Sequence, residues 1–162
     1  MPAEIKAEIG KGVAAIDAVG WDRLNNGNPF TSHAFLSSLE DSGSVGQGTG
    51  WSPTPITIRD EAGGMSAALP AYLKAHSQGE YIFDHHWADA YERAGGQYYP
   101  KLQIAAPFSP VPGPRLLLND PSQSASLLAA AEMVVQQNGL SSAHATFVEE
   151  GQLELFRQAG WL

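Results

Sequence analysis

Residues 54–75 read TPITIRDEAGGMSAALPAYLKA, and this stretch decides the fold because it predicts a β-hairpin. Its two apolar runs flank DEAGG at residues 60–64, where glycines supply the positive φ angles that a tight reversal needs. Pro70 cannot donate to a strand ladder, so it indicates an edge or a bulge in the second strand. Apolar side chains of that strand can share one face, namely Met65, Ala67, Leu69 and Leu73.

The clearest helix pattern lies further along the chain. Asp120 followed by Pro121 is an N-cap and first-turn signal, and apolar residues then recur at helical spacing up to Asn138-Gly139. The other expected elements are an edge strand at 4–9, helices at 17–26, at 31–43 and at 85–96, a loop at 43–53, strands at 101–106 and 143–148, and a last helix at 149–160. This order predicts a mixed β-sheet covered by helices, an α/β (α+β) fold, and residues 1–162 are expected to form a single domain.

The composition is that of a globular chain, with 43% apolar and 16% charged residues. The absence of cysteine excludes disulfides, thiolate metal sites and cysteine nucleophiles. No stretch approaches the ~20 apolar residues that span a bilayer, and the N-terminus shows no signal-peptide pattern, so we expect a cytoplasmic protein without a membrane span. The formal net charge of −8 argues against general nucleic-acid binding.

Residues 80–115, EYIFDHHWADAYERAGGQYYPKLQIAAPFSPVPGPR, mix aromatic rings with charged side chains. Such mixing is typical of a binding pocket, because aromatic residues supply flat apolar walls while fixed charges orient a polar ligand. The alternative is a core in which Phe83 and Trp87 simply pack and Arg93 pairs with a neighbouring carboxylate on the surface. The aromatic residues of the segment are Tyr81, Phe83, Trp87, Tyr91, Tyr98, Tyr99 and Phe108.

Two further motifs have ordinary explanations. GQGTG at residues 46–50 follows a helix and enters a strand, the reverse of a phosphate loop, so we predict an ordinary loop. Asp84, His85, His86 and Asp89 form the densest group of potential metal ligands, but adjacent histidines diverge and leave at most three ligands. We therefore predict no metal, and a metal-dependent hydrolase resting on these four residues stays a third hypothesis.

Three sequence words are informative as a set: FTSHAFLSSLEDSGSVGQGTGW at 30–51, ALPAYLKAHS at 68–77 and GEYIFDHHWADAYERAGGQYYPKLQIAAPFSPVPGPRLL at 79–117. From about Asn28 onward the chain resembles the FemAB-like family of predicted bacterial N-acyltransferases, which is associated with peptidoglycan biosynthesis or recognition and related to the GNAT acyltransferase fold. The resemblance implies a GNAT-like mixed sheet flanked by helices. It also implies that residues 1–162 are the N-terminal part of a longer FemAB-like protein, truncated before the last strands.

The resemblance leaves two acyl donors open, acyl-CoA and aminoacyl-tRNA. GNAT enzymes usually bind the acyl-CoA pyrophosphate through backbone N–H groups of a Q/RxxGxG/A loop. The corresponding stretch here is PFSPVPGPRLLLNDPSQ, residues 107–123, whose prolines remove such donors. Fem-type relatives use aminoacyl-tRNA instead, but this acidic chain has no basic tract, so tRNA binding would require the missing C-terminal portion.

The predicted function is therefore transfer of an aminoacyl or acyl group to an amine-bearing small molecule or peptidoglycan precursor. Such transfer needs a base for the ammonium proton and donors for the tetrahedral oxyanion. The candidate bases are Asp84 and His86, and the candidate proton donors are Tyr91 and Tyr98. The candidate substrate-binding residues are Trp87, Asp89, Arg93, Lys101 and Arg115. Chemistry alone selects these positions, and a non-catalytic binding module for a cell-wall peptide or sugar precursor is the alternative.

Overall fold

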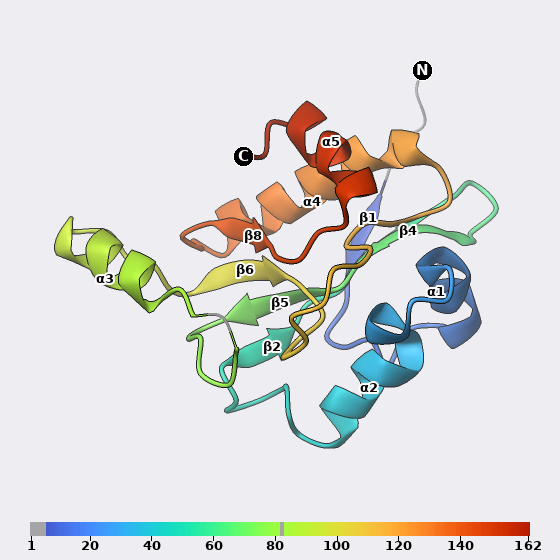
Figure 1. The fold of residues 1–162 in the computed structure, drawn as a ribbon. Helices are drawn as coiled ribbons and strands as arrows, with labels where there is room; N and C mark the ends of the chain where they lie inside the picture. Colours follow the sequence, from blue (N-terminus) through green and yellow to red (C-terminus); the bar gives the residue numbers. More distant parts are fainter. Residues whose placement is uncertain (1–5, 82) are drawn as a thin grey trace.

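The computed structural model describes residues 6–81 and 83–162 (Figure 1). Its α-helices are α1 (Ala18–Asn25), α2 (His33–Asp41), α3 (His85–Arg93), α4 (Ser124–Gln137) and α5 (Glu150–Gln158). Its strands are β1 (Ala7–Ile9), β2 (Trp51–Pro53), β3 (Ile56–Arg59), β4 (Met65–Leu69), β5 (Ala71–Lys74), β6 (Lys101–Ile104), β7 (Leu117–Leu118) and β8 (Ala143–Ala145). The mixed α/β class predicted from the sequence is confirmed.

The predicted hairpin is present and connects two four-stranded sheets. One sheet has the strand order β1-β3-β4-β7, and the other has the order β2-β5-β6-β8. Pro70 alone separates β4 from β5, and its carbonyl accepts a hydrogen bond from the Ala105 N–H at 3.1 Å. The prediction of an edge at this proline is wrong, because Pro70 is buried at the junction where one long strand passes between the sheets.

Helix α4 covers one face of both sheets. Its contacts reach β3, β4, β6 and β8, because its apolar stripe is long enough to span the junction. Leu127 and Leu128 are fully buried against strand residues such as Ile56, Leu69 and Leu102. Asp120 caps the short 3-10 turn Pro121–Gln123 that leads into α4, by accepting a hydrogen bond from the Ser122 N–H at 2.9 Å. This main core therefore holds the two sheets together.

The opposite face is fully covered over only one of the sheets. Helix α1 contacts β4 and β7, and its Trp21 and Leu24 are buried there, as their spacing predicted. Over the second sheet, Figure 1 shows long loops on this side and α3 projecting from the body between the end of β5 and the start of β6. Among the helical residues of α3 only Ala88 is buried. The sequence thus supplies helices for three of the four sheet faces, whereas on the last one Leu39 of α2 and Phe108 pack over Trp51 and Tyr72 and the rest is lined by loops.

Two short strands differ from the sequence prediction. Trp51–Pro53 was expected to belong to the loop at 43–53, but it pairs with β5 because the buried ring of Trp51 fixes it against the sheet. Leu117–Leu118 forms a two-residue strand beside β4. The predicted strand at 4–9 appears as β1, and residues 4 and 5 lie outside the described residues.

No helix in the described part of the chain is long and apolar enough to cross a membrane.

Candidate functional site

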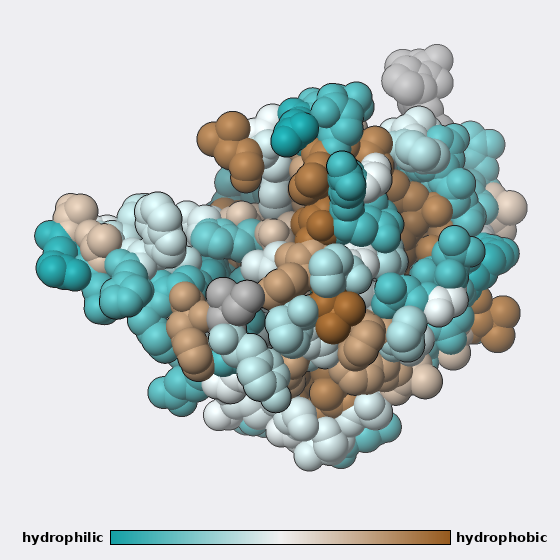
Figure 2. All heavy atoms as spheres, in the orientation of Figure 1, coloured by the Kyte–Doolittle hydropathy of each residue, from teal (hydrophilic) through white to brown (hydrophobic). Residues whose placement is uncertain are grey.

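A cavity of about 250 Å³ lies on the loop-lined face of the second sheet. Its floor is made by strand side chains of β5, β6 and β8 and by the residue after β8, namely Lys74, Lys101, Gln103, His144 and Thr146. Its walls come from the 75–84 loop, the first turn of α3 and the 105–110 segment. Figure 2 shows polar and apolar surface interleaved over the centre of the molecule, without one broad apolar patch.

Strand alternation explains why polar side chains gather on this floor. Leu102 and Ile104 point into the core beneath α4, so Lys101 and Gln103, which alternate with them along β6, point to the other face. Lys74 lies directly opposite Lys101 in the β5–β6 register. Two lysines are therefore buried side by side, each about 1% exposed, and each needs a carboxylate partner.

Asp84 is the partner of Lys101 and the centre of a polar cluster. Its carboxylate pairs with the Lys101 ammonium and accepts hydrogen bonds from the hydroxyl groups of Tyr98 at 2.9 Å and Tyr99 at 2.8 Å. Ser77 also donates to it. Burial opposes ionisation of Asp84, but these hydrogen bonds outweigh burial and hold its pKa well below the usual range. Asp84 is thus a fixed anion that ties together the 75–84 loop, the 97–100 segment and β6.

Glu80 is the partner of Lys74. The side chain of Lys74 is 1% exposed, whereas that of Glu80 is 18% exposed and borders the cavity. The Lys74 ammonium also lies 4.9 Å from the ring centre of Trp51. Within the described residues Glu80 is the single hydrogen-bond acceptor for this ammonium, so further N–H donors of Lys74 stay available at the cavity floor.

His144 provides a neutral imidazole beside these charges. Burial, and then the nearby Lys101 ammonium, lower the pKa of His144 to about 4. Its Nε2 lies 2.9 Å from the Ser142 hydroxyl, which fixes the orientation of the ring. The site therefore combines an ammonium with free donors, an ion-paired carboxylate and an uncharged base on one floor.

The sequence matches the FemAB-like family, described as peptidoglycan biosynthesis/recognition, over residues 12–162. The chain belongs to the FemAB-like family. Among solved structures, this FemAB-like chain is similar to an acetyltransferase of Trypanosoma brucei, with 13% identity, a TM-score of 0.47 and coverage of 98% of this chain and 93% of that chain. A search of curated proteins gave no match.

Three of the residues predicted for the site of this FemAB-like chain, Asp84, Trp87 and Lys101, border the cavity, and Tyr98 contacts it through Asp84. Asp84 and Lys101 form the central ion pair, and the Tyr98 hydroxyl donates to Asp84. Burial, and then the Asp84 carboxylate, raise the pKa of Tyr98. Trp87 stands at the cavity edge with 76% of its surface exposed. Residues 80–115 thus supply part of the cavity lining, and their role in binding stays a prediction.

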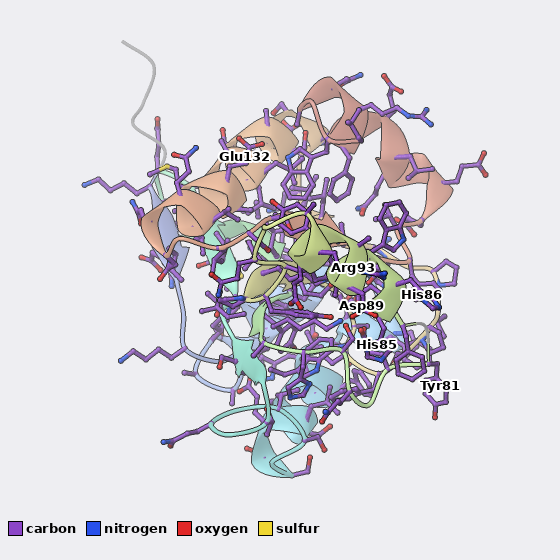
Figure 3. The ribbon with its side chains drawn as sticks, turned by 90° about the vertical axis from the view of Figure 1, so that its left-hand side faces the viewer. Tyr81, His85, His86, Asp89, Arg93 and Glu132 are labelled. Carbon is purple, nitrogen blue, oxygen red and sulfur yellow. The ribbon has the colours of Figure 1, made fainter. Side chains whose placement is uncertain are left out.

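The other predicted residues lie elsewhere. His86, Asp89 and Arg93 are exposed along α3 and are not part of the cavity lining (Figure 3). Tyr91 is half exposed and meets Tyr98 edge to face, with ring centres 6.2 Å apart. Helical geometry explains this separation, because α3 projects from the body and turns most of its side chains to solvent.

Arg115 is buried away from the cavity. Its guanidinium donates to the backbone carbonyls of Thr146 at 2.8 Å, Val111 at 3.0 Å and Pro114 at 3.2 Å. Burial lowers its pKa to about 10. This arginine clamps the 111–115 segment to the chain after β8, and its donors are committed to that contact.

Sequence reasoning missed Lys74, Glu80 and His144. A signal for them exists in the strand patterns, because Lys74 and His144 each break an apolar strand at an alternate position. A charged or polar residue at a buried strand position requires a partner, and Glu80 follows Lys74 closely enough to be that partner. What the sequence alone does not provide is the register that places these strands beside Lys101.

The possible metal ligands are not gathered. Asp84 turns toward Lys101, while the His85 ring stacks on Phe83 with ring centres 5.0 Å apart. Over residues 6–81 and 83–162, no group of three or more histidine, aspartate or glutamate side chains has a geometry that could hold a metal ion.

Proposed function

We propose that the cavity is the centre of an N-acyltransferase that moves an aminoacyl or acyl group onto an amine of a peptidoglycan precursor. The observation that carries the proposal is the position of Lys74, a buried ammonium with free donors, on the same floor as the neutral His144. Membership of the FemAB-like family supports this class of function. The expectation that residues 1–162 belong to a longer FemAB-like protein is part of the proposal.

We assign Lys74 the role of stabilising the oxyanion that forms during acyl transfer. When the amine nitrogen attacks the acyl carbon, the carbonyl π bond opens and negative charge develops on the oxygen. A preorganised donor in a site shielded from water stabilises that charge, because it needs no reorientation during the reaction. Lys74 meets this requirement through its burial and its ion pair with Glu80.

We assign His144 the role of accepting the proton that the attacking nitrogen loses. After the C–N bond forms, the former amine carries a positive charge and must lose one proton before the bond to the donor's oxygen or sulfur breaks. A neutral imidazole can accept that proton, and the departing oxygen or sulfur can then take it back from the imidazolium. Asp84 is a weaker base than His144, because four donors occupy its carboxylate and its pKa lies below that of the imidazole.

Asp84, Tyr98 and Lys101 are assigned to positioning. Their mutual hydrogen bonds hold the cavity wall against β6 and keep the second lysine charged and fixed beside the site. Lys101 is available as a further contact for a carboxylate or carbonyl oxygen of the substrate, because it borders the cavity. Lys101 is therefore proposed to bind substrate through this contact.

The start of α4 argues against the usual binding of acyl-CoA, whereas aminoacyl-tRNA would need a basic surface from the rest of the longer protein. A pyrophosphate at this helix start would meet the Asp120 carboxylate, which already accepts the Ser122 N–H, and Pro121, which has no N–H to offer. Like charges at one helix terminus repel each other, so the usual anion site is occupied by the protein itself.

The test is a transfer assay with the 162-residue chain and with the longer FemAB-like protein to which it is proposed to belong. Product mass is measured after incubation with acyl-CoA or charged tRNA and candidate amines, including peptidoglycan peptides. We expect the rate of product formation to fall at least about 100-fold in Lys74→Met, since loss of one oxyanion donor lowers the rate about 10²–10³-fold. His144→Gln should also lower the rate, and Arg93→Gln on exposed α3 is the control. Ligand binding without product from either donor would overturn the proposal in favour of a binding module.

A further inference from the structure

We propose that the aromatic mouth of the cavity, together with Glu80, binds the acceptor as its ammonium ion and selects positively charged amines over neutral and anionic ligands. The aromatic mouth is formed by Tyr81, Phe83, Trp87 and Phe108. This inference rests on the proposed function, because it names the chemical class of the acceptor for that same cavity.

The exposure of the rings is the first argument. Tyr81 is 75% exposed, Phe83 is 55% exposed and Trp87 is 76% exposed, although all three border a cavity. Apolar rings left in water at the mouth of a polar cavity contribute little to the stability of the fold. A ligand that covers these rings would explain why they are exposed there. Figure 3 shows Tyr81 extending outward from the loop that precedes α3.

The chemistry of aromatic faces is the second argument. The π face of an aromatic ring carries partial negative charge and attracts a cation, and tryptophan attracts it more strongly than tyrosine or phenylalanine. Three of the rings come from one short segment, residues 80–87, which also supplies Glu80 and Asp84 to the cavity. One loop therefore delivers apolar walls and negative charge to the same opening.

Glu80 is the carboxylate available to the ligand. Asp84 is saturated, because Lys101, Ser77, Tyr98 and Tyr99 all donate to it. Among the described residues, Glu80 has a single side-chain partner, Lys74, which bonds to Oε2 and leaves Oε1 without a donor. An ammonium that enters past the rings can donate to this second oxygen, and the charge-assisted hydrogen bond would fix its nitrogen above the floor. One ammonium proton passes to Oε1 of Glu80 before attack, which gives the neutral amine that the transfer step needs.

The balance of charge excludes an anion at the mouth. The two lysines lie at the floor and are each matched by one carboxylate, so they add no net charge at the opening. The whole chain carries a net charge of −8, which raises the local concentration of cations and repels anions. Oxyanion stabilisation by Lys74 at the floor and ammonium binding at the mouth thus occupy different levels of one cavity.

Three probes that share one carbon chain and differ in charge test the inference: n-butylammonium, 1-butanol and butyrate. Binding to the full chain is followed by NMR through the Trp87 indole N–H, assigned by its loss in Trp87→Phe. We expect n-butylammonium to bind at least about 10-fold more tightly than 1-butanol, and butyrate to bind least. A ring-to-aliphatic change, Trp87→Leu, should weaken n-butylammonium about 3- to 20-fold and leave 1-butanol within about 2-fold, which follows from the size of cation–π contacts.

The matched control is Tyr91→Leu, which removes an exposed ring of the same helix that does not border the cavity. In Tyr91→Leu, probe binding is followed through the intact NMR signal of Trp87. In Trp87→Leu, which lacks that signal, probe binding is followed by the broadening of the probe's own NMR lines. Because Trp87 is largely exposed and Tyr91 is half exposed, both variants should fold like the parent chain. Glu80→Gln adds a second loss of ammonium affinity, provided that its unfolding midpoint shows a folded chain.

Equal affinity for n-butylammonium and 1-butanol, or equal losses in Trp87→Leu and Tyr91→Leu, would overturn the inference. Its failure differs from failure of the proposed function. If transfer to amines occurs while Trp87→Leu leaves KM for the amine unchanged, the acyltransferase stands and the ammonium subsite falls. If n-butylammonium binds selectively but no donor gives product, the subsite stands and the acyltransferase falls.

Discussion

At the residue scale, Asp84 supports the site more than any other side chain, because it neutralises Lys101 and accepts from two tyrosines. Asp84→Asn leaves the buried Lys101 ammonium without its counter-charge. Breaking a buried ion pair in this way typically costs about 3–5 kcal/mol, and the partial exposure of Asp84 suggests the lower value, about 3 kcal/mol. Urea unfolding measures the change. Asp89→Asn on exposed α3 is the control, and a loss no larger than in that control would contradict the assigned role.

The same carboxylate sets the acid sensitivity of the fold. The pKa of Asp84 is lower in the folded state than in the unfolded state, so its stabilisation is complete above pH 4 and is lost as the pH falls below about 4. The free energy of unfolding, measured by urea titration between pH 5 and pH 2.5, should fall less steeply in Asp84→Asn than in the parent chain. Parallel pH profiles for the two proteins would show that Asp84 is not the titrating group.

His144 acts in a higher pH range. Its folded pKa of about 4 lies below the ordinary value of 6.5, so the unfolded chain binds the extra proton between these values and stability falls as the pH drops from about 6.5 to 4. In an NMR titration, the imidazole signal that disappears in His144→Gln should not shift between pH 8 and pH 5.5. A midpoint near pH 6.5 for that signal would remove the buried neutral imidazole from the proposal.

The residues that the sequence predicted and those that it missed differ in how far their partners lie along the chain. Asp84, Trp87, Tyr98 and Lys101 fall in one dense segment, so composition alone indicated them. His144 enters from β8, and its place depends on the parallel pairing of that strand with β6. Arg115 was predicted as a ligand because of its charge, whereas burial assigned its donors to carbonyl groups.

At the element scale, two glycines offer opposite tests of backbone conformation. Gly63 has a φ of +84° in the hairpin turn, where a Cβ is strained although nothing crowds it. Gly63→Ala should destabilise the protein by about 1 kcal/mol. Gly151 lies in helix α5 with open space around it, so Gly151→Ala should stabilise by up to about 1 kcal/mol. Thermal melts of both variants give the signs, and equal signs would contradict the backbone argument.

The elements that were predicted correctly are those whose signals are local. The hairpin has its glycine turn, α1 has Asp17 as its N-cap, and α4 has the Asp120-Pro121 start, so each is specified by neighbouring residues. β2 and β7 are too short for periodicity and exist only because β5 and β4 lie beside them. The junction at Pro70 is likewise a tertiary feature, since it needs Ala105 as a partner from outside the hairpin.

At the scale of the whole molecule, α4 makes the two sheets one cooperative unit. Leu128→Ala removes a fully buried side chain from the core shared by both sheets and should cost about 3 kcal/mol. Hydrogen exchange should show the amides of β3 and β6 losing protection together, because the same core residue supports both sheets. Met133→Ala on the exposed side of α4 is the control. Loss of protection in only one sheet would show that the sheets unfold separately.

Helix α3 projects from the body and carries Trp87 of the aromatic mouth, so a protease should cut the chain there first. With only Ala88 buried, α3 can unfold locally at a small fraction of the free energy needed to unfold the sheets. Brief trypsin treatment should therefore cut after the exposed Arg93 before it cuts the body, and the two fragments should leave a protein whose core still melts cooperatively. An amine bound at the cavity mouth would slow that cut, because its contact with Trp87 stabilises α3 against local unfolding.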